Sequence, residues 1–287
     1  MELNVSITKG KLYVVATPIG NLRDVTLRAC EVLSAADLIL AEDTRHSGIL
    51  LQHLGIRVSL QSLHDFNERV KTEPIIKRLL AGEQVALISD AGTPLVCDPG
   101  FHLVRRAIEE SIKVIPIPGP CALTAALSVA GLPTDRFLFN GFAPERGVPR
   151  RKLLESLAGF SATLVFYEVP HRIMGFLKDA IAVFGKERPA SVAREMTKKF
   201  ECIYRDSLSN LHQFLASHPE QQRGEFVVMI HGADQPEDDT RQEKVRLLKI
   251  LLGNSLSVKL AVSIASEILG GNRKELYRLA LELEKNE

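Results

Sequence analysis

Four short apolar runs recur in the first 120 residues, and each ends abruptly in a segment rich in glycine, proline or charge. The runs are LYVVA, LILA, VALI and VIPI, at residues 12–16, 38–41, 85–88 and 114–117. Runs this apolar suit strands that are buried on both faces of a parallel sheet, with amphipathic stretches such as 27–33 and 74–80 as crossover helices. The sequence therefore predicts an α/β domain over residues 1–120.

A second α/β domain is predicted over residues 121–232, directly after the first. Two adjacent strands near its end have short connections, which favours a mixed sheet over a second parallel one. Strands are predicted at 137–140, 163–167, 190–193, 201–204 and 225–230, and helices at 151–158 and 171–184.

The C-terminal tail is predicted to be a small helical domain over residues 241–287. The acidic stretch ADQPEDDT at 233–240 has no periodicity and is typical of a linker. Helices are predicted at 242–252, 258–269 and 273–283, and Gly270-Gly271-Asn272 is interpreted as a helix stop followed by a restart with Asn272 as N-cap. Two short helices joined by a Gly-containing turn are typical of a helix-turn-helix unit.

Composition narrows the class of protein. The formal net charge is +1, so binding of a polyanion would require a local cluster of basic residues on the surface. The four cysteines form no C-x-x-C pair and the histidines lack ligand spacing, so no metal site is expected. No signal-peptide pattern and no apolar run of about 18 residues is present, which predicts a cytoplasmic protein without a membrane span.

The strand-ending loops are the predicted ligand site, because ligands of open α/β sheets bind beyond the carboxyl ends of the strands. The first loop, TPIGN, lacks the G-x-G-x-x-G spacing, and no phosphate-loop motif occurs. The sequence therefore lacks the motifs that usually indicate NAD or ATP binding. The third loop, SDAGTP at 89–94, is predicted to form a backbone-lined shelf for a small ligand. Asp98 is interpreted as the N-cap of the next helix, with Pro99 at its first turn. PGPCA at 118–122 makes another shelf of small residues.

Seven motifs in one order resemble the ribosomal RNA small subunit methyltransferase I family of the tetrapyrrole-methylase superfamily. They are TPIGN, AEDTR, SDAGTPLVCDPG, PIPGPCA, GFAP, FYEVPHR and AREMTK, between residues 17 and 198. The tail also resembles that family's terminal helix-turn-helix. Cys121 is a departure, because relatives in the superfamily often have Ser there.

The resemblance implies a two-domain α/β methyltransferase with S-adenosylmethionine in the cleft between the domains. It implies 2′-O-methylation of a cytidine ribose in the decoding region of 16S rRNA in the small ribosomal subunit, and a homodimer. The residues expected to bind the cofactor are Pro18, Ser89, Asp90, Ala91, Gly92, Leu95, Cys121, Ala122, Tyr167 and Ala193.

Charged residues in the loops of both domains are candidates for catalysis and RNA binding. Arginines and Lys198 would hold phosphate, while a carboxylate or His46 assists deprotonation of the ribose hydroxyl. An alternative interpretation is an interdomain salt-bridge network, since buried charges must be paired. The catalytic candidates are Glu42, Asp43, Arg45, His46, Glu168, Arg194 and Glu195. The RNA-binding candidates are Arg150, Arg151, His171, Arg172, Lys198, Arg273 and Lys274.

Two other functions stay open at this point. A methylase of a tetrapyrrole ring would use the same fold, and a non-catalytic RNA-binding module would bind RNA without a cofactor. The tail carries nine Lys or Arg against six Asp or Glu between residues 241 and 287, which favours an RNA substrate.

Overall fold

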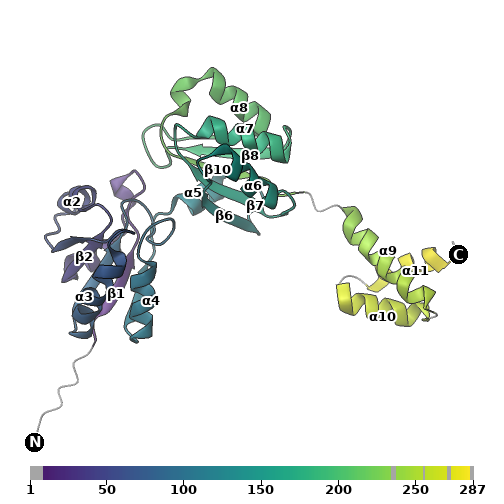
Figure 1. Ribbon diagram of the computed structural model, residues 1–287, viewed down its shortest axis with the longest axis horizontal. Coiled ribbons are helices and arrows are strands. Elements are labelled where there is room, and N and C mark those ends of the chain that lie inside the picture. The colour runs from purple at the N-terminus through teal and green to yellow at the C-terminus, as the bar shows by residue number, and fades with distance from the viewer. Residues whose placement is uncertain (1–8, 234–236, 255, 270–272, 285–287) are drawn as a thin grey trace, which may run out of the picture. The chain divides into compact units, whose positions relative to one another are not determined.

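The computed structural model describes residues 9–233, 237–254, 256–269 and 273–284. The chain forms two compact units, Met1–Gly232 and Ala233–Glu287. The larger unit holds two five-stranded sheets that follow one another along the chain, and the smaller unit is helical (Figure 1).

The first sheet is entirely parallel, as the apolar runs predict. Its strand order is β3-β2-β4-β1-β5, and every pair is parallel. Pro116 lies in β5, at the edge of the sheet, where a residue without an N–H costs no interior ladder bond. The strands are β1 (Lys11–Val15), β2 (Leu38–Ala41), β3 (Leu60–Ser62), β4 (Gln84–Ile88) and β5 (Lys113–Ile117).

Helices link these strands and bury the apolar faces of the sheet. Leu12, Leu40 and Leu87 belong to one buried cluster, whereas Val15 and Ile39 belong to another. Successive strand residues point to opposite faces, so these two clusters are the two sides of the sheet. The connecting elements are η1 (Leu22–Asp24), α1 (Leu27–Ala35), α2 (Thr44–His53), α3 (Glu68–Leu80) and α4 (Phe101–Glu109), and α5 (Ala122–Val129) follows the last strand.

The second sheet is mixed, with the order β6-β7-β10-β8-β9. Its one parallel pair, β6 with β7, is joined through a crossover helix, and the other pairs are antiparallel. The strands are β6 (Phe137–Phe142), β7 (Thr163–Glu168), β8 (Pro189–Arg194), β9 (Cys202–Ser207) and β10 (Phe226–Ile230). The helices are α6 (Gly147–Leu157), α7 (Ile173–Phe184), α8 (Leu208–Ser217) and η2 (Pro219–Gln222).

Helix α5 follows the first sheet in sequence but packs on the second. Leu123, Ala126 and Leu127 share a buried cluster with Val165 of β7 and Val227 of β10. The opposite face of the second sheet is covered by α6, α7 and α8, around Phe166 and Phe176. The predicted domain boundary at residue 120 immediately precedes α5 and stays a prediction.

The smaller unit contains α9 (Glu237–Gly253), α10 (Val258–Leu269) and α11 (Arg273–Glu284). Its core is built from one apolar stripe of each helix, including Leu248, Ala261, Ala265, Leu276 and Ala280. The predicted turn at 270–272, with Asn272 as N-cap, lies outside the described residues.

The structure confirms the fold class and corrects several element predictions. Short β3 was missed because LQS lacks an apolar run. Helix α8 was also missed, although Leu208, Leu211 and Leu215 form a buried stripe at helical spacing. The linker predicted at 233–240 was too long, because α9 begins at Glu237. Among the described residues, no helix is both long and apolar enough to cross a bilayer.

Candidate active site

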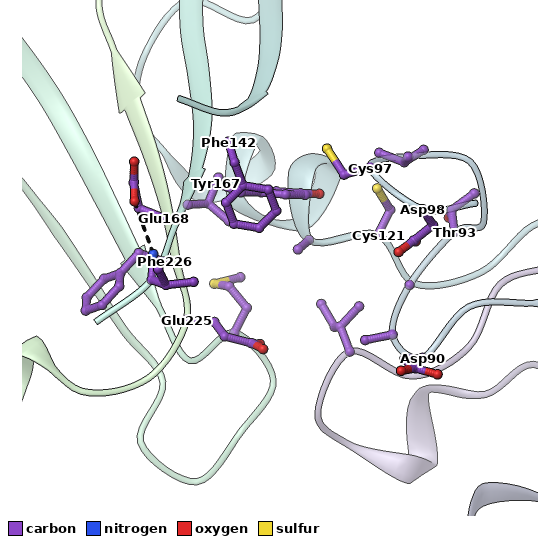
Figure 2. A pocket seen from close by; sticks show the side chains of 18 residues that line it. Asp90, Thr93, Cys97, Asp98, Cys121, Phe142, Tyr167, Glu168, Glu225 and Phe226 are labelled. Atoms are coloured by element: carbon purple, nitrogen blue, oxygen red, sulfur yellow. Dashed lines mark hydrogen bonds between the residues drawn. The ribbon is translucent and has the colours of Figure 1, made fainter. Parts of the chain in front are cut away.

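A pocket of about 240 Å³ opens in the larger unit, and its walls come from both sheets (Figure 2). Loops after β1 and β4 supply one wall and the start of α5 supplies another. The rest comes from the ends of β6 and β7, the loop after β8 and the start of β10. The residues that line it are Ile19, Asp90, Ala91, Gly92, Thr93, Val96, Cys97, Asp98, Cys121, Ala122, Phe142, Tyr167, Glu168, Val169, Met196, Glu225, Phe226 and Val227.

The shelf after β4 is fixed by backbone hydrogen bonds to the loop after β1. The Thr17 N–H donates to Gly92 O at 2.8 Å, and the Gly92 N–H donates back to Thr17 O at 3.1 Å. Gly92 has φ +87°, which favours glycine, and the Ser89 hydroxyl donates to its carbonyl at 3.1 Å. Backbone groups, small side chains and Asp90 therefore line the pocket here.

The rest of this loop is strained and contacts the second sheet. Leu95 and Cys97 have φ of +70° and +67°, values that non-glycine residues adopt at a cost. A Cβ on Gly141 would lie 2.8 Å from the Cys97 sulfur, so the loop after β4 lies directly against the end of β6. Helix α4 begins only at Phe101, and Gly100 with φ +125° is its N-cap. The interpretation of Asp98 as the N-cap was wrong, because Asp98 lines the pocket instead.

The carboxyl edge of the first sheet is strongly acidic. Burial, and then the negative charges of Glu42 and Asp90, raise the pKa of Asp98 to about 7. Burial and Asp90 likewise raise the pKa of Glu42 above its ordinary value. Asp90 accepts a hydrogen bond from the Asp43 N–H at 3.0 Å, which ties the loop after β2 to the pocket wall. This concentration of negative charge favours a cationic ligand.

Tyr167 connects the second sheet to the start of α5. Its hydroxyl accepts the Leu123 N–H at 3.1 Å, where the N-cap Cys121 makes no side-chain cap bond. The ring meets Phe139 and Phe142 edge-on, at centroid distances of 4.8 and 5.7 Å. Burial raises the pKa of Tyr167, so the phenol stays protonated at neutral pH.

Glu168 brings a buried carboxylate to the pocket. Arg172 pairs with it at 3.2 Å and also donates to the Ala143 carbonyl. Burial raises the pKa of Glu168, while the Arg172 charge acts in the opposite direction. Arg172 thus joins the end of β7 to the segment after β6 within the second sheet's edge. His171, the preceding residue, is exposed.

Lys198 forms a second charged cluster, with Glu195 and Glu225. Its ammonium lies 2.8 Å from Glu195 and 2.9 Å from Glu225, and Glu195 also accepts the Glu225 N–H at 2.9 Å. Burial opposes ionisation of Glu195, but the hydrogen bonds from Lys198 and the Glu225 N–H outweigh it and lower its pKa. The Lys198 stem lies over Gly20 of the loop after β1, so the lysine spans from one sheet's loops to the other's.

Several predicted site residues do not line the pocket. Ser89 and Ala193 are buried, whereas Arg45 is exposed on the surface and paired with Asp43 at 2.7 Å. Arg194 is buried, and its guanidinium donates to Arg223 O, Phe200 O and Gln221 Oε1. The non-lining residues predicted for cofactor binding and catalysis are Pro18, Ser89, Leu95, Ala193, Glu42, Asp43, Arg45, His46, Arg194 and Glu195.

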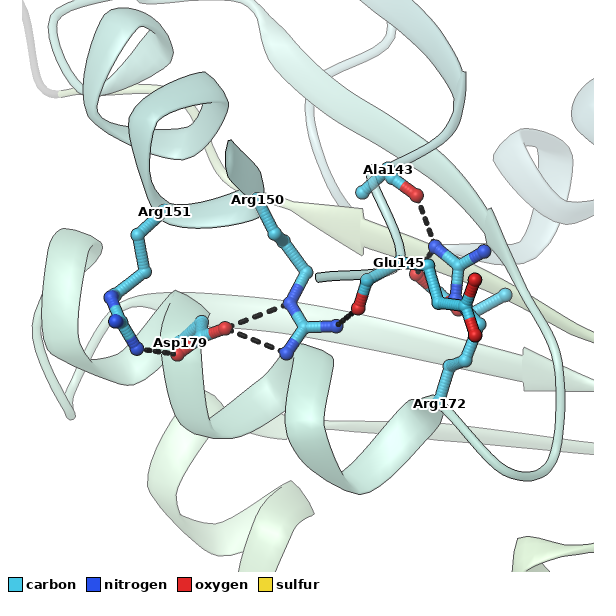
Figure 3. A network of polar contacts seen from close by, with 7 residues as sticks. Ala143, Glu145, Arg150, Arg151, Arg172 and Asp179 are labelled. Carbon is cyan, nitrogen blue, oxygen red and sulfur yellow. Dashed lines mark hydrogen bonds and ion pairs between the residues drawn. The ribbon is translucent and has the colours of Figure 1, made fainter. Parts of the chain in front are cut away.

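The predicted RNA-binding residues Arg150 and Arg151 on α6 belong to an ion-pair network (Figure 3). Arg150 is almost fully buried and pairs with Asp179 at 2.7 Å, while its Nη1 donates to Glu145 O. Arg151 reaches the other oxygen of the same carboxylate at 3.0 Å. Arg150 therefore has its donors engaged inside the fold and offers no exposed face to a phosphate. Arg273 and Lys274 lie in the smaller unit.

Eleven lining residues were missing from the predicted set. They are Ile19, Thr93, Val96, Cys97, Asp98, Phe142, Val169, Met196, Glu225, Phe226 and Val227. Eight of them fall within the seven motifs, so their positions carried a signal: Ile19, Thr93, Val96, Cys97, Asp98, Phe142, Val169 and Met196. Glu225, Phe226 and Val227 lie outside the motifs and carried none, because a buried strand residue and a pocket-lining one look alike in sequence.

Comparisons with known proteins identify the class and then the family. The Tetrapyrrole (Corrin/Porphyrin) Methylases model matches residues 11–212, so the chain is a methyltransferase of that class. The RsmI C-terminal HTH domain model matches residues 238–284. With these matches and the relatives below, the chain belongs to the ribosomal RNA small subunit methyltransferase I family.

Relatives at high identity cover almost the whole chain. A protein of Pseudomonas aeruginosa named ribosomal RNA small subunit methyltransferase I is 50% identical, covering 96% of this chain and 98% of its own. One of the same name from Escherichia coli O157:H7 is 46% identical, with 96% of both chains covered.

Solved structures share the fold at low identity. Uroporphyrin-III-C-methyltransferase from Thermus thermophilus has a TM-score of 0.55 at 22% identity, covering 78% of this chain and 94% of its own. A diphthine synthase has a TM-score of 0.59 at 17% identity, covering 78% and 90%. These likenesses confirm the two-sheet methylase fold.

Proposed function

We propose that this protein transfers the methyl group of S-adenosylmethionine to the ribose 2′-hydroxyl of a cytidine in the decoding region of 16S rRNA. The observation that carries the proposal is the acidic pocket between the two sheets, in a chain whose full-length relatives are named for small-subunit rRNA. A methyl donor with a sulfonium cation suits a pocket lined by Asp90 and Asp98, with the charge of Glu42 near enough to raise the pKa of Asp98.

The residues present fit such a donor. Ala91 and Gly92 offer backbone groups with almost no side chain in the way, and Cys121 and Ala122 do the same from the start of α5. Tyr167 is kept neutral and can donate its hydroxyl proton to a ligand while it accepts the Leu123 N–H. Phe142, Val96 and Met196 add apolar surface for the uncharged parts of the ligand.

When bound, the cofactor supplies a methyl group that is already activated, so the chain's main task is alignment of the ribose oxygen. Positioning alone can lower such a barrier by roughly 7 to 11 kcal/mol. Among the carboxylates that line the pocket, Asp98 is the candidate to accept the hydroxyl proton, because its pKa of about 7 suits proton transfer at neutral pH. Glu168 is fully buried and is held by Arg172. Exposed His171 and Arg45 follow strands β7 and β2 at these loop edges, where they can contact RNA phosphates.

Methyl transfer from a labelled donor tests the proposal directly. Small ribosomal subunits from cells that lack this gene, naked 16S rRNA and a porphyrinoid are offered in parallel. Label on the rRNA, at one position where 2′-O-methylation blocks alkaline cleavage, is the expected result. Label on the porphyrinoid alone would show a tetrapyrrole methylase, and RNA binding without donor binding would show a non-catalytic module.

We also propose that the protein works as a homodimer in the cytoplasm, as the family resemblance implies. Light scattering of the purified full chain checks the assembly state. A monomer at concentrations that support full methyl transfer would exclude the dimer as the active form.

A further inference from the structure

A groove of about 590 Å³ lies between α10 and α11 in the smaller unit, and it shares no lining residue with the methylation pocket. Its walls come from one face of each helix, because the lining positions are related by spacings of three and four residues. From α10 these are Lys259, Val262 and Ser263, and from α11 they are Arg273, Lys274, Tyr277, Arg278 and Leu281.

The charge of this groove is one-sided. Four of its eight lining residues are Lys or Arg, and none is Asp or Glu. Glu275 of α11 pairs with Lys244 of α9 at 3.0 Å, and the contact between Arg278 and Glu282 is long, at 3.9 Å between exposed side chains. A surface pair of that kind contributes little, so Arg278 is available to an anion.

An aromatic side chain lies among these cations. Tyr277 is 45% exposed, although a tyrosine in a small helical unit could bury its ring in the core. It follows Arg273 by one helical turn and precedes Leu281 by another, so it lies on the same stripe of α11. Exposed aromatic rings between basic side chains are the elements with which proteins stack bases and hold the backbone of single strands.

We infer that the α10–α11 groove binds a single-stranded segment of RNA, with Lys259, Arg273 and Arg278 on phosphates and Tyr277 against a base. The choice of RNA over DNA rests on the proposed function. The choice of single strand rests on shape: a helix inserts into the wide major groove of B-form DNA, whereas the major groove of an RNA duplex is too narrow for side chains to read. The pocket and the groove would then hold two parts of one substrate.

The test uses the full chain and a fluorescent single-stranded RNA of about ten nucleotides, which is within the site size of small single-strand binders. Lys259→Ala/Arg278→Ala should weaken binding about tenfold and lower the slope of log affinity against log salt by about 0.7 per lost phosphate contact. Tyr277→Ala should weaken binding about tenfold, and Tyr277→Phe should restore it.

The matched control is Arg246→Ala/Lys249→Ala, which removes the same charge from exposed positions of α9 outside the groove. It should change the affinity less than threefold. An equal loss in this control, no loss with Tyr277→Ala, or tighter binding to duplex DNA than to the RNA would each overturn the inference. A loss of binding to whole small subunits with unchanged RNA affinity would also overturn it, in favour of a protein partner.

Failure of the groove and failure of the proposed function give different results. If the groove variants bind RNA normally and still methylate small subunits, the inference about the groove is wrong and the proposed function stands. If the wild-type chain binds RNA through the groove but transfers no methyl group to any RNA, the proposed function is wrong and the inference about the groove stands. Affinity for S-adenosylmethionine, measured by calorimetry, should stay the same in all the groove variants.

Discussion

The side chain of Lys198 lies so close over Gly20 that a Cβ on this glycine would come within 2.3 Å of the lysine Cγ. Gly20 belongs to the loop after β1, whereas Lys198 follows β8 and is held by Glu195 and Glu225. One contact thus joins the loops of the two sheets at the side of the methylation pocket.

Gly20→Ala should therefore disturb both stability and ligand binding. The new methyl group must displace Lys198 from its two carboxylates, at a cost of about 1 to 3 kcal/mol in unfolding free energy. Urea unfolding and calorimetry with S-adenosylmethionine measure the two effects. Gly48→Ala is the control, because nothing lies within 4 Å of its added Cβ on helix α2, and it should be neutral or slightly stabilising. If the Gly20→Ala/Lys198→Ala double variant were no more stable than Gly20→Ala, the clash would not be the cause.

Asp98 should give the folded protein a defined pH dependence. Its pKa rises from 3.8 to about 7 on folding, so the folded state binds the proton more tightly than the unfolded state. That advantage is fully present below about pH 4 and is lost as the pH rises through 7. Asp98→Asn should match the wild type at pH 4 and exceed its unfolding free energy by on the order of 2 kcal/mol at pH 8, after allowance for solvent screening.

The same carboxylate should also control binding of a cation. The affinity of the wild type for S-adenosylmethionine should increase between pH 6 and pH 8 as Asp98 ionises, and Asp98→Asn should bind weakly with a flat profile over that interval. Calorimetry at each pH measures this. A wild-type profile that was flat as well would exclude Asp98 from the electrostatics of the pocket.

Arg150 should prove to be a structural residue. Arg150→Ala leaves the Asp179 carboxylate, which is 7% exposed, with only the outer Arg151 as partner. Breaking a buried ion pair from one side costs about 3 to 5 kcal/mol, whereas Arg151→Ala should cost less than about 1 kcal/mol. Urea unfolding measures both. RNA affinity that fell with Arg150→Ala while stability was retained would restore Arg150 as an RNA contact.

Tyr167→Phe should loosen the start of α5. The substitution removes the acceptor of the Leu123 N–H, and an unsatisfied buried donor costs about 1 to 3 kcal/mol. Because Cys121 and Ala122 line the pocket just before this N–H, affinity for the cofactor should fall as well. Tyr13→Phe, which removes a 3.3 Å hydrogen bond to Gln84 in strand β4 of the first sheet, is the control and should leave cofactor affinity unchanged.

Local patterns in the sequence were enough to predict most of the strands. Short apolar runs marked β1, β2, β4 and β5, so the ends of these strands could be placed within a residue. Strand β3 has a half-exposed pattern and only three residues, which leaves no periodic signal.

The site was harder to predict, because the role of each side chain depends on contacts with residues that are distant in sequence. Asp98 looks like a helix cap locally, but the tight packing of Gly100 against Leu87 moves the helix start past it. Arg150 looks like part of a basic patch until Asp179, 29 residues further on, is seen to neutralise it. Local preference cannot reveal either partner.

The pocket's lining residues extend along the chain from Ile19 in the loop after β1 to Val227 in β10. Domains fold as units while the ribosome is still synthesising the chain, beginning at the N-terminus. The parallel sheet has all its strands once residue 117 has been made, but β10, at the centre of the second sheet, comes last of the ten strands. A nascent chain can therefore carry a finished parallel sheet for a further hundred or so residues of synthesis, on the order of 5 to 20 seconds at about 5 to 20 residues per second, before it has anywhere to hold a methyl donor.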